Sequence, residues 1–174
     1  MTERRQAILD VALELFLDDG REATIDEICR RSGASNGSAY HHFGSKDGIA
    51  AELTTRFLGD YQEGFLAALE QGGVRDAVAH HLRWVAGHPD WARFLLRHAT
   101  GGERLTELNR AFYAQVDDWF ARHRVRALPR DVRAAILIGP AQELSRAWLD
   151  GRSTTPPDDA AEALGEAAWR ALKP

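Results

Sequence analysis

Cysteine is nearly absent from this sequence: Cys29 is the only one among 174 residues. A disulfide within the chain is therefore impossible, and a cysteine metal cluster would need ligands from elsewhere. The adjacent pairs His41-His42 and His80-His81 do not replace it, because neighbours on a helix point about 100° apart and make a poor two-ligand site. We therefore predict no metal and no other cofactor, in a protein of the reducing cytoplasm.

Long apolar runs are missing as well. The longest covers residues 134–141, whereas a membrane span needs about 20 apolar residues. A basic start followed by an apolar stretch, the pattern of a secretory signal, is not seen, and we expect no such signal. With 44% apolar and 28% charged residues, the composition is typical of a globular protein of one or at most two domains, without a membrane partner.

The alternating pattern of strands is also absent, and apolar residues recur at helical spacing between glycine and proline stops. We therefore predict an all-α fold of about nine helices. The predicted helices are one that ends at Asp19-Gly20, then 24–32, 36–42, one from Ser45 to Gly72-Gly73, 74–87, one from Pro89 to Gly101-Gly102, one through 105–120, one from Pro129 to Asp150-Gly151, and 158–172.

Several helix ends carry capping residues. Thr24, with Glu27 three residues later, predicts a capping box in which each side chain satisfies one backbone amide at the helix start. Ser35 and Ser45 are suited to cap the next two helices. Gly33 suits the left-handed position that follows a helix end.

A tight turn at 33–35 joins helices 24–32 and 36–42, which is the helix-turn-helix arrangement. The second helix turns its apolar side chains to the core and presents the others outward: Asn36, Gly37, Ser38, Tyr40, His41 and His42. Small residues let a helix approach the floor of a major groove, and Asn36 can pair with an adenine edge. Tyr40 has the alternative interpretation of a core aromatic.

The segment 33–37 also fits the G-x-S-x-G pattern of a hydrolase. In that pattern the serine sits on a strained turn between a strand and a helix. A capped helix precedes Ser35 here, so Ser35 is better explained as a cap. We predict that the protein is not an enzyme.

The stretch from Thr24 to Lys46 resembles the DNA-binding domain of TetR-type (tetracycline-repressor) transcriptional regulators. The matching segments are TIDEI at 24–28, SGAS at 32–35, GSAYHHF at 37–43 and SKD at 45–47. With the amphipathic helix that precedes Thr24, the resemblance covers about the first third of the chain. The later helices match the family only in number, order and length.

The resemblance implies a role for each matching residue. Tyr40, His42 and Lys46 are expected to contact phosphates, and Thr24 to offer its hydroxyl and its helix end to the DNA backbone. Asn36, Gly37, Ser38 and His41 are expected at base edges, and Ser35, which caps their helix, completes the predicted DNA-binding set. The family often has a basic residue where this chain has Asn36, which favours base reading there.

The net charge of −4 is an objection to DNA binding. Residues 1–50 hold six Lys/Arg against nine Asp/Glu, a difference of −3. Screening limits surface fields to about 8–10 Å, so the distribution of charge matters more than its sum. Arg30, Arg31, Lys46 and the histidines bracket the recognition helix, and we expect weak non-specific binding with selectivity resting on few contacts.

Residues 134–141, in the helix that starts at Pro129, are apolar all round, and helix 158–172 is rich in alanine. A helix of that kind must be buried on every side. In the family resembled, the last two helices of each subunit form a four-helix dimer interface. A purely intramolecular core remains the alternative. Pro140 is expected to kink its helix.

The same resemblance implies a small-molecule cavity within the later helices. The candidates combine aromatic walls with a few polar groups, as ligand sites do: Trp84, His88, Trp91, Phe94, His98, Phe112, Trp119, Gln142 and Arg146. Ordinary core positions are the alternative for each. The effector would be small and apolar or amphipathic.

The sequence thus predicts a DNA-binding domain at 1–46 and an effector-binding and dimerisation domain at 47–174. The predicted function is a ligand-responsive transcriptional regulator, in this family most often a repressor, that binds a palindromic operator as a homodimer. Helix 45–72 would transmit the response. The alternative is a helical protein-interaction module that keeps the helix-turn-helix without binding DNA.

Overall fold

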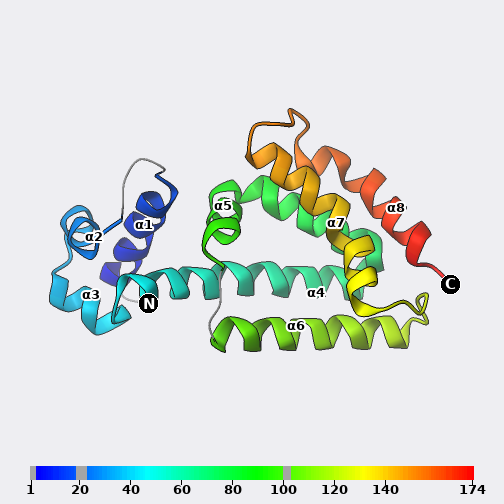
Figure 1. Cartoon of the computed structure of the whole chain (residues 1–174), viewed down its shortest axis with the longest axis horizontal. Coiled ribbons are helices and arrows are strands. Elements are labelled where there is room, and N and C mark those ends of the chain that lie inside the picture. The colour runs from blue at the N-terminus through cyan, green and yellow to red at the C-terminus, as the bar shows by residue number, and fades with distance from the viewer. Residues whose placement is uncertain (1–2, 19–22, 100–102) are drawn as a thin grey trace.

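The computed structural model describes residues 3–18, 23–99 and 103–174, which form helices and short connections and no strand. The elements are α1 (Glu3–Leu17), α2 (Ile25–Ser32), α3 (Asn36–Phe43), α4 (Lys46–Gly87), α5 (Pro89–His98), α6 (Glu103–Arg122), α7 (Arg130–Leu149), the 3-10 turn η1 (Pro157–Ala160) and α8 (Ala161–Leu172). Helices α1 to α3 form one end of an elongated molecule, and α4 runs from there into the body (Figure 1). The predicted all-α fold is confirmed.

Helix α4 consists of two arms that meet at Gly73. Gly73 has φ 74° and ψ −153°, a conformation that essentially only glycine adopts. The rings of Tyr61 and His81, 20 residues apart, approach to 5.6 Å between centroids, whereas a straight helix would separate them by roughly 30 Å. We call residues 46–72 the long arm and residues 74–87 the short arm. The predicted break at Gly72-Gly73 is confirmed, and the eight described α helices therefore correspond closely to the nine predicted.

Two apolar cores lie along the long arm. The N-terminal core joins α1, α2 and α3, and it also takes in Ile49, Leu53 and Phe57 of α4 and Phe94 of α5. The body core starts at Phe65 and gathers side chains from both arms, α6, α7 and α8. One stripe of the long arm therefore belongs to both cores. The domain boundary at residues 46–47 stays a prediction.

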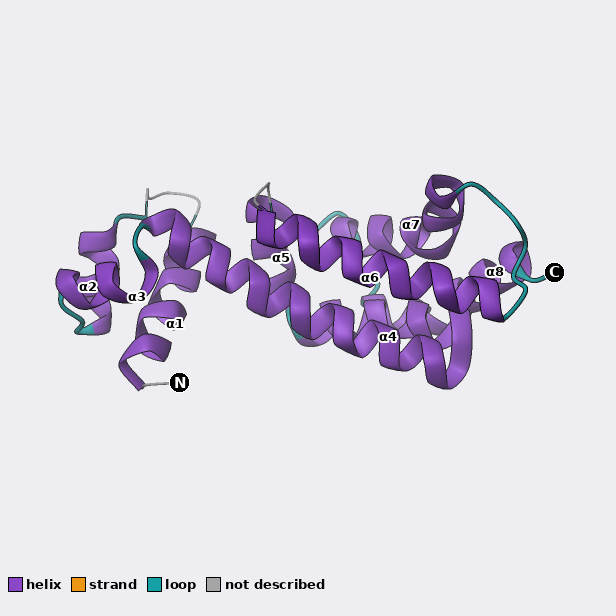
Figure 2. Ribbon diagram, turned by 90° about the horizontal axis from the view of Figure 1, so that it is seen from below, coloured by secondary structure: helices purple, strands orange, loops and turns teal. Residues whose placement is uncertain are grey.

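Helix α6 runs beside the long arm (Figure 2), where Nε2 of Gln62 donates a hydrogen bond to Oδ1 of Asn109 at 3.0 Å. Helix α7 continues through Pro140 and changes direction along its length in Figure 1. Within the described ranges, no helix has the length and apolar character needed to cross a bilayer. The predicted helix ends at Asp19-Gly20 and Gly101-Gly102 lie outside the described residues.

Candidate DNA-binding surface and effector cavity

The ends of α2, α3 and α4 are capped by hydroxyl side chains. Oγ1 of Thr24 accepts from the amide of Glu27 at 3.2 Å, and Oγ of Ser35 accepts from the amide of Ser38 at 3.2 Å. Oγ of Ser45 accepts from the amide of Gly48 at 3.0 Å. Gly33, with φ 69°, closes α2 in the left-handed conformation. The caps by Thr24, Ser35 and Ser45 and the left-handed Gly33 are thus confirmed. The reciprocal bond of Glu27 in the predicted capping box stays a prediction.

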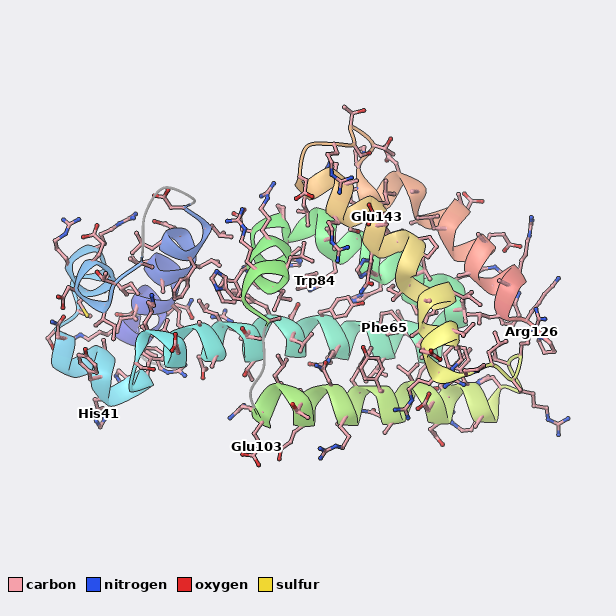
Figure 3. All side chains as sticks on the ribbon, in the orientation of Figure 1. His41, Phe65, Trp84, Glu103, Arg126 and Glu143 are labelled. Carbon is pink, nitrogen blue, oxygen red and sulfur yellow. The ribbon has the colours of Figure 1, made fainter. Side chains whose placement is uncertain are left out.

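Helix α3 has one buried face and one exposed face. Ala39 is buried in the N-terminal core, and Phe43 lies half-buried under the guanidinium of Arg5. Tyr40 is 55% exposed, so it is not a core aromatic. His41 points away from the protein at the end of the molecule (Figure 3). The exposed face holds the predicted set, with Ser38 half-buried: Asn36, Gly37, Ser38, Tyr40, His41 and His42.

The arginines expected to bracket α3 are held by carboxylates of the same chain. Arg30 donates to both carboxylate oxygens of Glu27, at 2.8 and 2.6 Å, and Arg31 donates to Glu14 at 2.6 Å. Asn36 is also engaged, because its Nδ2 donates to Asp26. The positive charge available near α3 is therefore smaller than the residue count suggests.

A cavity of about 180 Å³ lies between the two arms of α4, α5 and α7. Its lining is mostly apolar, with a few polar groups: Leu58, Tyr61, His81, Trp84, Val85, Ala92, Leu95, Leu96, Gln142, Ser145, Arg146 and Leu149. We call it the inner cavity. Three predicted ligand-binding residues line it, namely Trp84, Gln142 and Arg146. Trp84 is further fixed by donating from Nε1 to Oδ2 of Asp60 at 2.8 Å.

A chain of three polar side chains crosses the wall of the inner cavity. Oη of Tyr61 lies 3.1 Å from Nδ1 of His81, and Nε2 of His81 lies 3.3 Å from Oγ of Ser145. Burial, together with the neighbouring His80, lowers the pKa of His81 to about 4, so the ring is neutral at pH 7. Burial likewise raises the pKa of Tyr61.

A neutral imidazole has one donor nitrogen and one acceptor nitrogen. When Nδ1 of His81 carries the proton, it donates to Tyr61, whose own hydroxyl proton is then left to donate elsewhere. When Nε2 carries it, Ser145 is left with the spare proton. In either tautomer of His81, the three side chains can thus offer one hydroxyl donor to a ligand, from Tyr61 or from Ser145. The sequence does not predict this set of contacts, because Tyr61 and His81 meet only through the reversal at Gly73.

A second cavity, also of about 180 Å³, lies between the long arm, α6 and α7, and we call it the outer cavity. It shares Leu58, Tyr61 and Gln142 with the inner cavity. Phe112, another predicted ligand-binding residue, lines it, and Phe112 and Phe65 pack edge to face at 5.4 Å. Figure 3 shows Phe65 and Trp84 in the interior above the long arm. The two cavities are therefore adjacent and are separated by Tyr61 and its neighbours.

Two other predicted ligand-binding residues lie at the joint with the N-terminal core. Phe94 is fully buried in that core, 5.7 Å from the ring of Phe57. His98 stacks on Phe94 at 4.8 Å, and its Nε2 lies 3.5 Å from the backbone oxygen of Phe16. Neither lines the inner or the outer cavity.

The remaining candidates pack against other rings. His88 stacks on Trp91 at 4.6 Å, and Trp91 in turn stacks on Phe57 at 4.5 Å. Trp119 stacks on His123 at 4.1 Å, on the α6 side of the body. These three candidates also lie outside the linings of both cavities, and their roles in ligand binding stay predictions.

The outer faces of α7 and α8 form an apolar groove of about 460 Å³. Its lining consists of small and branched residues: Val78, Val132, Ala135, Ile136, Leu137, Pro140, Ala141, Leu164, Ala167, Ala168 and Ala171. Val132 is 41% exposed, and Ala135 and Pro140 are exposed. Within one chain, the segment 134–141 is thus not buried on every side, although its apolar sequence predicts that it is. The intramolecular core alone does not cover it.

Comparison with known proteins gives a consistent result. The family profile described as "Bacterial regulatory proteins, tetR family" matches residues 8–53, the segment that builds the N-terminal core up to Leu53. The HTH-type transcriptional repressor KstR2 of Rhodococcus jostii is 32% identical over 121 residues, which are 63% of this chain and 59% of that repressor.

A second relative matches over most of both chains. The HTH-type transcriptional regulator BetI 2 of Chromohalobacter salexigens is 31% identical, over 92% of this chain and 83% of that protein. Among solved structures, the regulator FadR of Bacillus subtilis, in complex with stearoyl-CoA, superposes with a TM-score of 0.76 at 15% identity. The superposition covers 94% of this chain and 96% of that one, and it shows that the fold is the same.

Proposed function

Because this chain belongs to the tetR family of bacterial regulatory proteins, whose members are helix-turn-helix transcriptional regulators, we propose that it is a ligand-responsive repressor that binds a palindromic operator as a homodimer. The main support is the exposed face of α3, a capped helix at one end of the molecule, together with separate cavities in the body.

In this proposal α3 enters the major groove. Gly37 adds no side chain that would keep the helix away from the bases, and Asn36 and His41 face base edges. Tyr40 and Lys46 hold phosphates, which position the protein without reading sequence. Because one short helix reads only a few base pairs, two copies are needed for a selective site.

The groove on α7 and α8 is the surface that a second copy would cover. A twofold axis through this groove places the same apolar patch of each chain against the other. Its small side chains, such as Ala135 and Ala167, permit close approach of helices. The two α3 helices would then have to match half-sites about one DNA turn, roughly 34–36 Å, apart.

The inner and outer cavities together form the proposed effector site. Their apolar lining favours a small apolar or amphipathic molecule, and the Tyr61–His81–Ser145 chain favours one with a hydrogen-bond acceptor. That the FadR structure of the same fold holds stearoyl-CoA supports an effector of this amphipathic kind without identifying it.

Helix α5 gives the effector a direct route to the DNA-binding unit. Leu95 lines the inner cavity and also packs against the N-terminal core, and its neighbour Phe94 is buried in that core. Arg97 also donates to the backbone oxygen of Leu17 in α1 at 3.3 Å. A ligand that favours one position of α5 therefore shifts α1 to α3 with it, and the long arm of α4 transmits the shift in the same way. The distance between the two α3 helices of the dimer then changes.

Selection of bound duplexes from a random pool, followed by affinity measurements at several salt concentrations, tests the proposal. We expect a palindromic site with two half-sites and an affinity that falls steeply as salt rises, because phosphate contacts release counterions. Binding that shows neither sequence preference nor salt dependence would instead support the protein-interaction alternative. That alternative is favoured by the carboxylates already paired with Arg30 and Arg31.

A further inference from the structure

Asn36, the first residue of α3, is tied to an acidic side chain of α2. Its Nδ2 donates a hydrogen bond to Oδ1 of Asp26 at 2.7 Å, across ten residues of sequence. Both residues are exposed, and each lies in the first turn of its helix. The contact therefore joins the two helix starts of the helix-turn-helix on the outside of the N-terminal core.

A carboxylate discriminates between the two ends of a carboxamide. It only accepts hydrogen bonds, whereas the amide has an accepting oxygen and a donating nitrogen. With Nδ2 toward Asp26 the contact is attractive. Rotation of the Asn36 amide by 180° would instead place Oδ1 against the carboxylate, where two acceptors repel. Asp26 thus holds the Asn36 amide in one of its two orientations.

The held amide keeps the groups that adenine needs. One N–H of Asn36 is used by Asp26, which leaves one N–H donor and the acceptor Oδ1. In the major groove adenine offers the N7 acceptor and the N6 donor, and asparagine pairs with both at once. A freely rotating amide can also direct its donor at O6 of guanine or O4 of thymine, so it discriminates less between bases.

We propose that Asp26 is a positioning residue for base recognition, which through its hydrogen bond makes Asn36 select adenine at one position of each half-site. The inference rests on the proposed function, since it requires α3 to enter the major groove. Asp26 has a second, opposite effect, because its negative charge repels the phosphates of any duplex. It therefore increases selectivity while it lowers overall affinity.

Two variants of Asp26 test these effects. Asp26→Asn keeps a hydrogen-bonding partner for Asn36 but loses the carboxylate that only accepts, whereas Asp26→Ala removes the partner altogether; both remove the charge. The measurement is the affinity for the duplex selected by the parent protein and for the same duplex with the adenine pair replaced. A good bidentate contact gives a preference of about five- to 150-fold in the parent.

We expect Asp26→Ala to reduce this preference to less than about threefold at that one base pair and to leave the other positions unchanged. Asp26→Asn should lose most of the preference as well, because its own carboxamide can pair with Asn36 in either orientation. Both variants should bind every duplex more tightly than the parent, because the negative charge is gone. In the Asn36→Ala background, Asp26→Ala should have no further effect on base preference, because no amide is left to orient.

The matched control is Asp10→Ala. Asp10 accepts from Nε2 of Gln6 at 2.6 Å, which is the same kind of exposed contact on α1, and its loss should not alter base preference. An Asp26→Ala variant that keeps the adenine preference, or that loses preference equally at every position, overturns the positioning role while the proposed function stands. A parent protein that selects no sequence overturns the proposed function itself.

Discussion

At the scale of single residues, the least expected feature is an uncharged histidine inside the body. His81 is buried, and both its ring nitrogens face hydroxyl groups, those of Tyr61 and Ser145. Hydroxyl groups can satisfy a neutral imidazole, but they do not compensate a positive charge. The surroundings of His81 at the inner cavity therefore stabilise the neutral imidazole over the charged one.

This burial makes stability depend on pH. The pKa of His81 falls from 6.5 to about 4 on folding, so between these values the unfolded chain binds a proton that the folded chain excludes. Stability is then complete above pH 6.5 and is lost as the pH falls toward 4, with a contribution from this group of about 2–4 kcal/mol. Urea denaturation at pH 7, 5.5 and 4.5 measures the loss.

The variant His81→Gln should show a smaller loss of unfolding free energy over this pH range than the parent. His41→Gln is the control, because His41 is exposed, and it should follow the parent. Equal slopes for His81→Gln and the parent would mean that the ring takes up its proton inside the folded protein.

At the scale of elements, the reversal in α4 depends on one glycine. A side chain at residue 73 would meet only Trp119, at 3.5 Å, so space is not the obstacle. The obstacle is the backbone, because a non-glycine residue at φ 74° and ψ −153° costs of order 1–3 kcal/mol. We expect Gly73→Ala to lower the free energy of unfolding by that amount.

Gly59→Ala is the matched control for Gly73→Ala. Gly59 lies within the long arm, and an added Cβ there meets nothing within 4 Å, so alanine should stabilise the helix by about 0.5–1 kcal/mol. Denaturation curves of the two variants should thus shift in opposite directions. A stabilising Gly73→Ala would show that the two arms can join through another backbone geometry.

Local sequence signals predicted the elements well, and distant contacts escaped them. The caps at Thr24, Ser35 and Ser45 and the break at Gly72-Gly73 act over a few residues, so composition and spacing reveal them. The pairing of Tyr61 with His81 arises only after the chain reverses. Periodicity can place Tyr61 on one face of a helix, but it cannot show what that face meets after the chain reverses.

At the scale of the whole molecule, local features could again be predicted from the sequence, whereas contacts between distant segments could not. The exposed face of α3 followed from its alternation of small, polar and apolar residues, whereas the ion pair of Arg31 with Glu14 joins α2 to α1 across 17 residues. Aromatic composition also overestimated the cavity lining, because an aromatic ring fits a core as well as a pocket. Phe94 is buried in the N-terminal core, and only the packing of α5 determines that it lies there and not in a cavity.

The last prediction concerns assembly. Ala135 is exposed on α7 and lines the groove with α8, so Ala135→Asp should leave the fold of one chain intact. In a dimer through this groove the new carboxylate would be buried without a partner, which costs several kcal/mol. We expect the parent to sediment as a dimer at micromolar concentration and Ala135→Asp as a monomer.

Ala114→Asp, at an exposed alanine of α6, is the control and should remain dimeric. Because a palindromic operator needs two linked readers, Ala135→Asp should also lose affinity for the full site while keeping its weak affinity for a half-site. A dimeric Ala135→Asp would place the interface on another face of the molecule.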